Sequence, residues 1–222
     1  MGKLATHPGV PLADRGFMLL RRLVLLYLGL LLFGLSAAMM VQASLGLDPW
    51  NVLHEGLTLH LNVSFGTVII GLGALLMLIW IPLRQRPGLG TISNVLLVGL
   101  AADASLAVLP QPDDLLLSGA LLIGGIVLNG IASGMYIGAG LGPGPRDGLM
   151  TGLAARTGWS IRFTRTALEI CVLALGWLLG GAVGLGTVLY ALGIGPIIHV
   201  FLPLFEAMVR KPESERRAGA VR

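Results

Sequence analysis

The chain has 222 residues, of which 55% are hydrophobic and 12% are charged, and its mean hydropathy is +0.86. This composition excludes an ordinary soluble domain and is typical of a polytopic protein whose main partner is the lipid bilayer. The single cysteine, Cys171, excludes an internal disulfide framework, and the net charge of +4 comes from scattered residues that form no nucleic-acid-binding face.

Six apolar segments are long enough to cross a bilayer, which takes about 20 helical residues. In chain order they are residues 18–41, 63–83, 88–109, 115–139, 163–181 and 185–206. The first is longer than the apolar part of a signal peptide, so we expect it to be retained. Two stretches, 49–61 and 145–157, have a helical pattern but are too short and too polar to span. Whether they lie flat on the membrane or re-enter it stays open.

The basic residues set the orientation of these spans. With the N-terminus in the cytoplasm, all 15 Lys and Arg residues fall on the cytoplasmic side, as the positive-inside rule requires. Segment 42–62 then lies outside, as do Asp113 and Asp114. If the two short helices also spanned, Arg84 and Arg86 would move outside. The charges therefore predict a multi-pass protein of a bacterial inner membrane with both termini cytoplasmic.

A repeat relates the two halves of the sequence. A shift of 96 residues aligns about 17–112 with 113–208, and the block Gly-Leu-Gly-Thr at 88–91 returns unchanged at 184–187. Each copy has the order span, short helix, span, span. An odd number of spans per copy turns the second copy upside down, an arrangement common in secondary transporters.

The predicted fold is thus an all-α membrane protein with six transmembrane helices in two inverted three-helix repeats, each with one short non-spanning helix. We expect four parts in chain order. They are a cytoplasmic N-terminal tail at 1–17, the first repeat at 18–112, the second repeat at 113–208 and a basic cytoplasmic tail at 209–222.

The starts of the two short helices are the main candidate binding positions. Asp48 is placed to cap the first helix, and Gly144 occupies the equivalent place before the second. Free backbone N–H groups at a helix start favour anions, yet Arg146 falls where the helix dipole disfavours a cation. An anionic partner would explain it: Asp147, Glu169 or a substrate. Asp147 also fits as an ordinary first-turn acid. The predicted substrate-binding residues are Asp48, Asn51, Gly144, Arg146 and Asp147.

Charged side chains also occur within the predicted spans. Arg165 precedes Glu169 by four residues, so the two share a helix face. They are either a self-neutralising pair or a proton-linked carboxylate with its partner. Asp103 and His199 occupy equivalent positions in the two copies and are either solvated near the interface or a titrating pair.

Small residues recur every four positions along one predicted span, at Gly130, Gly134, Gly138 and Gly142. Such a ridge predicts close helix packing. No HExxH, CxxC or GxxxxGK[ST] pattern occurs in the sequence. We therefore predict no metal, no cofactor and no enzymatic activity.

Three motifs carry a resemblance to a known family: GLGPGPRDGLMTGL at 140–153, Arg-x-x-x-Glu at 165–169 and GWLLGGAVGLGT at 176–187. They resemble the YczE branch of the YitT/YczE-type bacterial integral membrane proteins. The stretch LGLDPWNVLHEGL at 45–57 also resembles that family's matching segment. The resemblance covers about 18–206 and implies the membrane location and the helix count. Family members often carry Asp where this chain has Asn51.

These observations predict a secondary transporter or exporter of a small molecule, anionic or amphiphilic, that works by alternating access. Arg146 and its helix start would bind an anionic group, and Glu169 or Asp147 would couple protons. The competing hypothesis is a non-transporting membrane scaffold that supports a partner enzyme or an assembly. A lipid-modifying enzyme comes third. The substrate, the coupling ion and a homo-oligomeric state stay open.

Overall fold

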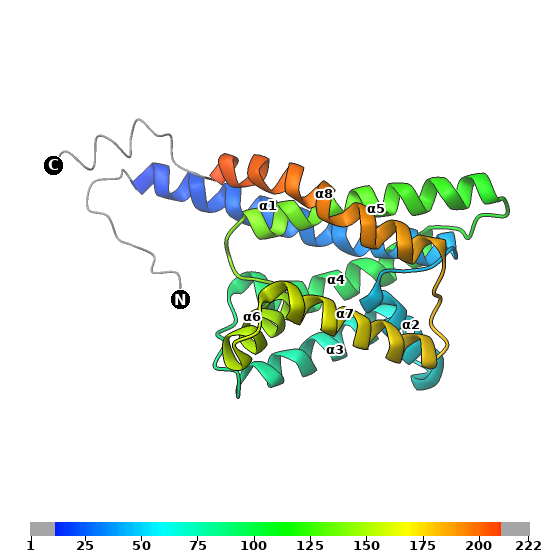
Figure 1. Cartoon of the computed structure of the whole chain (residues 1–222). Helices are drawn as coiled ribbons and strands as arrows, with labels where there is room; N and C mark the ends of the chain where they lie inside the picture. The colour runs from blue at the N-terminus through cyan, green and yellow to red at the C-terminus, as the bar shows by residue number, and fades with distance from the viewer. Residues whose placement is uncertain (1–11, 210–222) are drawn as a thin grey trace.

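The computed structural model describes residues 12–209 and shows eight α-helices there (Figure 1). They are α1 Leu12–Ala43, α2 Pro49–Leu61, α3 Phe65–Trp80, α4 Leu89–Val108, α5 Leu115–Gly138, α6 Pro145–Thr157, α7 Ile161–Leu178 and α8 Leu185–Val209. The predicted all-helical fold and both short helices, at 49–61 and 145–157, are confirmed. Most of the two predicted tails, residues 1–11 and 210–222, lies outside the described residues.

Four of the described helices are long and apolar enough to cross a membrane: α1 from Gly16, α4, α5 and α8. A fifth span results if α2 and α3, which meet at 111°, count as one broken span. The helices found at the predicted spans 63–83 and 163–181, α3 and α7, therefore do not have the length and composition of a membrane span on their own. The reason is physical: α3 has 16 residues, or about 24 Å of helix, and α7 carries Arg162, Arg165 and Glu169.

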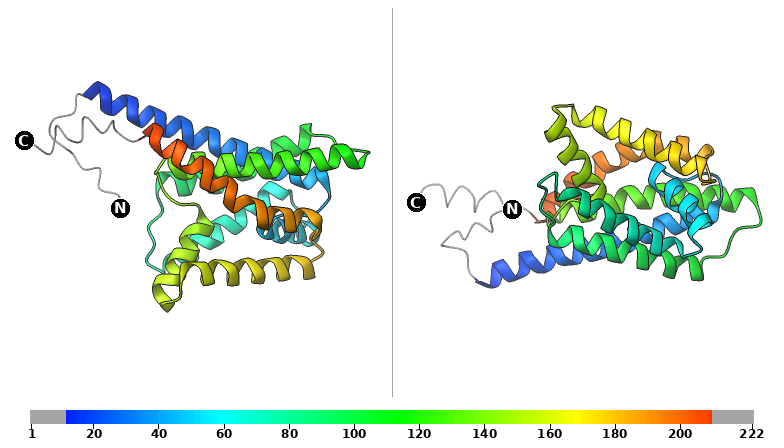
Figure 2. Two further views of the ribbon diagram at one scale, coloured as in Figure 1. Left: turned by 45° about the horizontal axis from the view of Figure 1, so that its top comes forward. Right: turned by 90° about the horizontal axis from the view of Figure 1, so that it is seen from below.

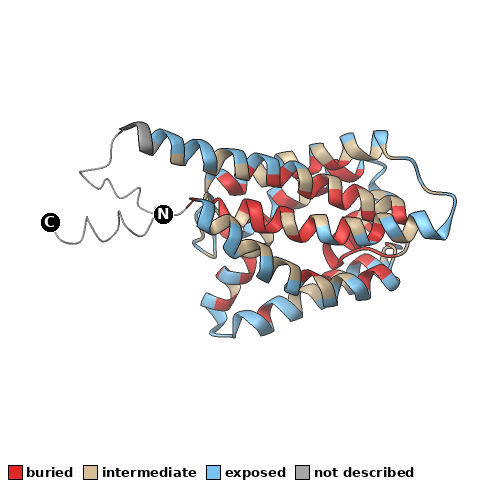
Figure 3. Ribbon diagram, turned by 90° about the horizontal axis from the view of Figure 1, so that it is seen from above, coloured by how far each residue is buried: buried red, intermediate tan, exposed pale blue. Residues whose placement is uncertain are grey.

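The long helices form the core of the molecule. α1 packs lengthwise against α5, and α4 and α8 flank this pair on α1 and α5 respectively (Figure 2). The second layer holds α2 and α6 together with α3 and α7, with α2 packed on α7 and α6 on α3. Buried residues follow the centre of the long helices, while their outer faces are exposed, as expected of surfaces that meet lipid (Figure 3).

The predicted small-residue ridge packs against α8 at Gly130, Gly134 and Gly138, whereas Gly142 lies beyond the end of α5, in the loop that docks on Gly88. A Cβ at Gly134 would meet Phe201 and Leu202, and one at Gly138 would meet Phe205. Only a residue without a side chain allows two helix backbones to approach this closely.

The connections gather at two opposite ends of the molecule. The start of α1, the end of α8, the turn 81–88 and the loop 139–144 lie at the left end in Figure 1, and the loop 109–114 and the turn 179–184 lie at the right. Two contacts tie the left end together: Arg21 Nη1 donates to the carbonyl of Met208 at 3.5 Å, and Arg156 Nη2 to that of Pro82 at 2.5 Å. Both of these arginine contacts therefore join separate segments at this end.

Replacing Gly34 by Ala should destabilise the protein by separating α1 from α4. The new Cβ would lie 2.6 Å from the Val98 carbonyl oxygen and 2.8 Å from the Ala102 nitrogen, backbone atoms that cannot turn aside. We expect a loss of about 1–3 kcal/mol, visible as a lower midpoint of thermal unfolding in detergent. Gly71→Ala is the control, because nothing lies within 4 Å of its Cβ position. Equal midpoints for the two variants would contradict the close packing.

Candidate functional site

Two glycine-rich loops lead into the short helices, and each is docked on a distant part of the chain. The N–H of Gly186 at the start of α8 donates to Leu45 O at 2.8 Å, and the N–H of Gly90 at the start of α4 donates to Leu141 O at 2.9 Å. Each loop contains a glycine with a left-handed backbone, Gly46 and Gly142, with φ of 106° and 133°. The loops therefore turn sharply inward, and α2 and α6 begin inside the protein.

The starts of α2 and α6 meet in the middle of the molecule. Asp48 is the N-cap of α2, and Arg146 is the second residue of α6. Arg146 Nη1 lies 3.6 Å from Asp48 Oδ1. From this meeting point the two helices run outward to opposite ends of the molecule (Figure 1). The first turn of α2 is buried within the protein and does not lie on its surface.

Asp48 begins a buried chain of polar contacts along one face of α2. The Asn51 side-chain amide donates to Asp48 Oδ2, and Asn51 Oδ1 lies 3.0 Å from His54 Nδ1. Asp48, Asn51 and His54 are 2%, 2% and 4% exposed. Polar groups buried this deeply need partners, and the spacing of three residues supplies them within the helix.

The start of α6 is held by three neighbouring helices. Trp80 of α3 donates its indole N–H to the Pro145 carbonyl at 3.0 Å, and Thr91 of α4 donates to the Pro143 carbonyl at 2.7 Å. Tyr136 of α5 donates to Asp147 Oδ2 at 2.9 Å, and the same oxygen accepts the Gly144 N–H at 3.2 Å. Asp147 therefore caps its own helix, as an ordinary first-turn acid does.

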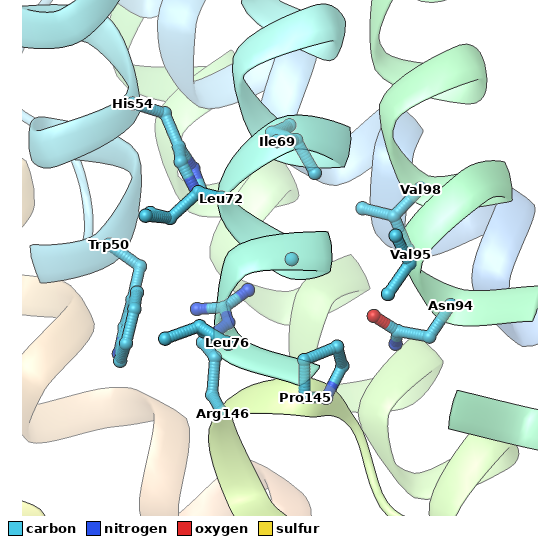
Figure 4. A pocket seen from close by; sticks show the side chains of 11 residues that line it. Trp50, His54, Ile69, Leu72, Leu76, Asn94, Val95, Val98, Pro145 and Arg146 are labelled. Atoms are coloured by element: carbon cyan, nitrogen blue, oxygen red, sulfur yellow. The ribbon is translucent and has the colours of Figure 1, made fainter. Parts of the chain in front are cut away.

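Arg146 lies against aromatic faces and a small cavity. Its guanidinium carbon is 5.5 Å from the ring centres of both Phe33 and Trp50. The cavity, about 30 Å³, has room for a water molecule or two. Figure 4 shows Arg146 rising into it between Trp50 and Asn94. Among the described residues the guanidinium makes no hydrogen bond, and its contact with Asp48 is an ion pair at 3.6 Å.

A second donor at this cavity lacks a partner. The indole nitrogen of Trp50 is buried and makes no hydrogen bond with the described residues, whereas Trp80 has its carbonyl acceptor. Trp50 and Arg146 both line the cavity. An indole and a guanidinium can only donate hydrogen bonds, so two donors without an acceptor lie near the start of α6, and the guanidinium that lines the cavity favours a ligand with acceptor oxygens.

A larger recess lies on the other side of the α6 start. It measures about 350 Å³ and is lined by Ile137, Gly140, Gly142, Pro143 and Asp147. Arg146 and Asp147 are adjacent in sequence but line separate hollows, because consecutive helical residues point in different directions. The first turn of α6 thus stands between a small inner cavity and a recess of ligand size.

The other predicted site residues lie apart from this centre. Arg165 Nε lies 3.0 Å from Glu169 Oε1, and the two side chains are 53% and 34% exposed. Asp103 accepts hydrogen bonds from the Ser64 hydroxyl at 2.5 Å and the Gly66 N–H at 2.6 Å, which ties α4 to the start of α3. His199 is exposed, and no polar contact in the described residues joins it to Asp103.

Tyr190 of α8 begins a chain of hydrogen bonds between three helices. Its hydroxyl donates to Asn129 Oδ1 at 3.0 Å, and the Asn129 amide donates to the Ser36 hydroxyl at 2.9 Å. This chain joins α8, α5 and α1.

Sequence reasoning did not assign roles to Trp50, His54 or Tyr136. The spacing of Asp48, Asn51 and His54, three residues apart, would have placed His54 on the face of the other two. Tyr136 lies on another helix, and no local pattern announces its contact with Asp147.

Comparisons with known proteins cover most of the chain. A model described as a family of unknown function (DUF6198) matches residues 20–203. An uncharacterised protein of Haemophilus influenzae is 37% identical over 85% of this chain and 86% of its own length. The uncharacterised membrane protein YczE of Bacillus subtilis is 32% identical, covering 80% and 83% of the two chains. No solved structure matches the chain. The resemblance to the YczE-type proteins is confirmed.

Replacing Trp80 by Phe should loosen the start of α6. The indole N–H is the donor to the buried Pro145 carbonyl, and Trp80 is 1% exposed. We expect a loss of about 1–3 kcal/mol, measured by thermal unfolding in detergent. Trp177→Phe is the control, because Trp177 is 65% exposed. If both variants unfold at the wild-type temperature, Trp80 does not anchor α6.

Proposed function

We propose that this chain, which belongs to the family DUF6198 and to the YczE-type membrane proteins, is a secondary transporter of a small anionic molecule. The proposal comprises six spans in two inverted repeats, alternating access between them, and a bacterial inner membrane with both termini in the cytoplasm. It assigns binding and translocation to the chain and no covalent chemistry.

The pairing of the helices supports the inverted repeat. α2 begins at Pro49 and α6 at Pro145, α3 at Phe65 and α7 at Ile161, α4 at Leu89 and α8 at Leu185. The start of every second-half helix in these pairs follows its counterpart by the offset of the sequence repeat. The two loop contacts, Gly186 to Leu45 and Gly90 to Leu141, also exchange under this offset. A two-fold relation between the halves accounts for both observations.

One pair of equivalent contacts differs between the halves, which supports alternating access. α3 packs along α4, and a Cβ at Gly99 of α4 would meet the Gly66 carbonyl at 2.5 Å. α7 has no comparable packing on α8, and nothing lies within 4 Å of a Cβ at Gly195, the equivalent of Gly99. Two similar halves in different arrangements are what a transporter open to one side requires.

The unsatisfied donors at Arg146 are the observation that carries the anion assignment. The guanidinium makes no hydrogen bond in the described structure, the buried Trp50 indole N–H has no partner, and the Arg146 and Trp50 side chains line one cavity at the start of α6. A carboxylate or phosphate oxygen would satisfy the guanidinium, and the helix start adds favourable partial charge. The cavity is too small for a metabolite in this arrangement, so binding requires the halves to move.

Cysteine labelling tests the inverted topology. Val63 and Trp159 are equivalent, exposed residues in the turns that follow the two short helices. In a background with Cys171→Ala, Val63→Cys should react with a membrane-impermeant maleimide added to intact cells, and Trp159→Cys should react only after the cells are opened. The two sites labelling from the same side would rule out the inversion.

Anion transport is tested in proteoliposomes with a panel of radiolabelled carboxylates, phosphate and short-chain sulfonates. Wild type should accumulate at least one of them. Arg146→Ala should lower that rate by at least about tenfold, because charge-assisted hydrogen bonds contribute about 1.5–3 kcal/mol. Arg165→Ala is the matched control and should retain most activity, because its pair with Glu169 is half exposed. Wild type that moves no anion would overturn the proposal in favour of the scaffold.

A further inference from the structure

The Asp48 carboxylate is buried with one cation beside it. Its side chain is 3% exposed, and Arg146 Nη1 lies 3.6 Å from Oδ1. Its other polar contacts come from Asn51, whose backbone N–H lies 3.4 Å from Oδ1 and whose amide donates to Oδ2. Asn51 is uncharged. Among the described residues, Arg146 is therefore the cation paired with Asp48.

The hydrogen bonds along α2 all point toward this carboxylate. The Asn51 amide nitrogen donates to Asp48, so Asn51 Oδ1 is the atom that faces His54. A carbonyl oxygen only accepts, which requires a hydrogen on His54 Nδ1. Donation from His54 to Asn51 and from Asn51 to Asp48 makes Asp48 the acceptor at the end of this chain, a role that its ionised form can fill at both oxygens. Arg146 beside it balances that charge.

An anion at Arg146 would compete with Asp48 for the guanidinium. Ligand oxygens in charge-assisted bonds lie about 2.7–2.9 Å from the donor nitrogen, closer than the 3.6 Å of the ion pair. Asp48 cannot follow Arg146, because it caps α2 and is tied to Asn51. It would be left as a buried negative charge next to a second one. A buried carboxylate without a partner costs several kcal/mol and becomes neutral by binding a proton.

We propose that Asp48 is the proton-exchanging group of this site, binding one proton when an anion occupies Arg146 and releasing it when the anion leaves. The inference rests on the proposed function and adds its coupling ion. The proton bonds to a carboxylate oxygen, and no other bond forms or breaks. One proton moves with each anion, so a monovalent anion crosses without net charge.

The ionisable groups near Asp48 come from three helices. His54 of α2 reaches it through Asn51, Arg146 of α6 forms its ion pair, and Tyr190 of α8 donates its own hydrogen bond to Asn129. Arg146 always carries its charge, so its occupancy by an anion changes the charge balance at Asp48.

The two carboxylates predicted as proton couplers have different surroundings. Glu169 is 34% exposed, so water stabilises its charge whether or not Arg165 is present. Asp147 accepts hydrogen bonds from Tyr136 and Gly144, which do not leave when an anion arrives. Asp48 differs from both because its counter-charge is the ligand-binding residue itself.

Infrared spectroscopy of the purified full-length protein in detergent at neutral pH tests this proposal without a known substrate. Arg146→Gln removes the counter-charge, as a bound anion would neutralise it. We expect this variant to gain the carbonyl band of one carboxylic acid per molecule. Wild type and Arg146→Lys should lack the band, and the double variant Asp48→Asn/Arg146→Gln should lose it.

Arg165→Gln is the matched control and should show no acid band, because Glu169 remains solvated. If Arg146→Gln does not give a folded, monodisperse protein, Arg146→Met is measured in the same way. A folded Arg146 variant without the band would overturn the proposal, because Asp48 would then hold its charge without its cation. The transport assay tests the anion site separately. If transport depends on Arg146 but the folded Arg146 variants show no acid band, the anion site stands and only the proposed role of Asp48 is wrong.

Discussion

Backbone groups buried inside a membrane protein must find hydrogen-bond partners within the protein, and this constraint explains the arrangement of the centre. The loops before α2 and α6 continue from the ends of α1 and α5 and turn inward to the starts of α8 and α4. Their carbonyls at Leu45 and Leu141 are satisfied by glycine N–H groups that begin α8 and α4. Glycine is required at these contacts because the two backbones nearly touch: a Cβ at Gly184 would lie 2.6 Å from the Leu45 oxygen.

Once the loops are docked, the positions of the charged residues follow. α2 and α6 begin where the two loops end. This brings Arg146 Nη1 to 3.6 Å from Asp48 Oδ1. Trp80, Thr91 and Tyr136 fix the α6 start from three directions. The guanidinium is placed by its helix and by aromatic faces, and not by hydrogen bonds of its own. A guanidinium that is held by packing and keeps its N–H donors available is suited to reversible binding of a ligand.

Local patterns in the sequence were sufficient to predict the helices, but they did not predict which distant segments contact one another. Asp48-Pro49 and Gly144-Pro145 are helix-start patterns, and both short helices begin there. The (i, i+4) spacing also predicted the Arg165–Glu169 pair. By contrast, amphipathicity left the position of α2 open, because the polar residues Asn51 and His54 in its first half face other protein groups and not water. The roles of Asp103 at the start of α3 and of Tyr136 at Asp147 depend on packing between distant segments, which no local pattern records.

The docking of the loops across the molecule also sets an order of assembly. The carbonyl of Leu45 meets Gly186, which the ribosome delivers only after seven of the eight described helices. Until α8 is in place, the first loop and the start of α2 lack their partner, although α1 has long since been inserted. The centre of the protein is therefore completed last, and the contacts that define it have the greatest sequence separation, which makes their formation slow. A chain interrupted before α8 would leave the Leu45 carbonyl without its hydrogen-bond partner, a state that quality-control proteases can recognise.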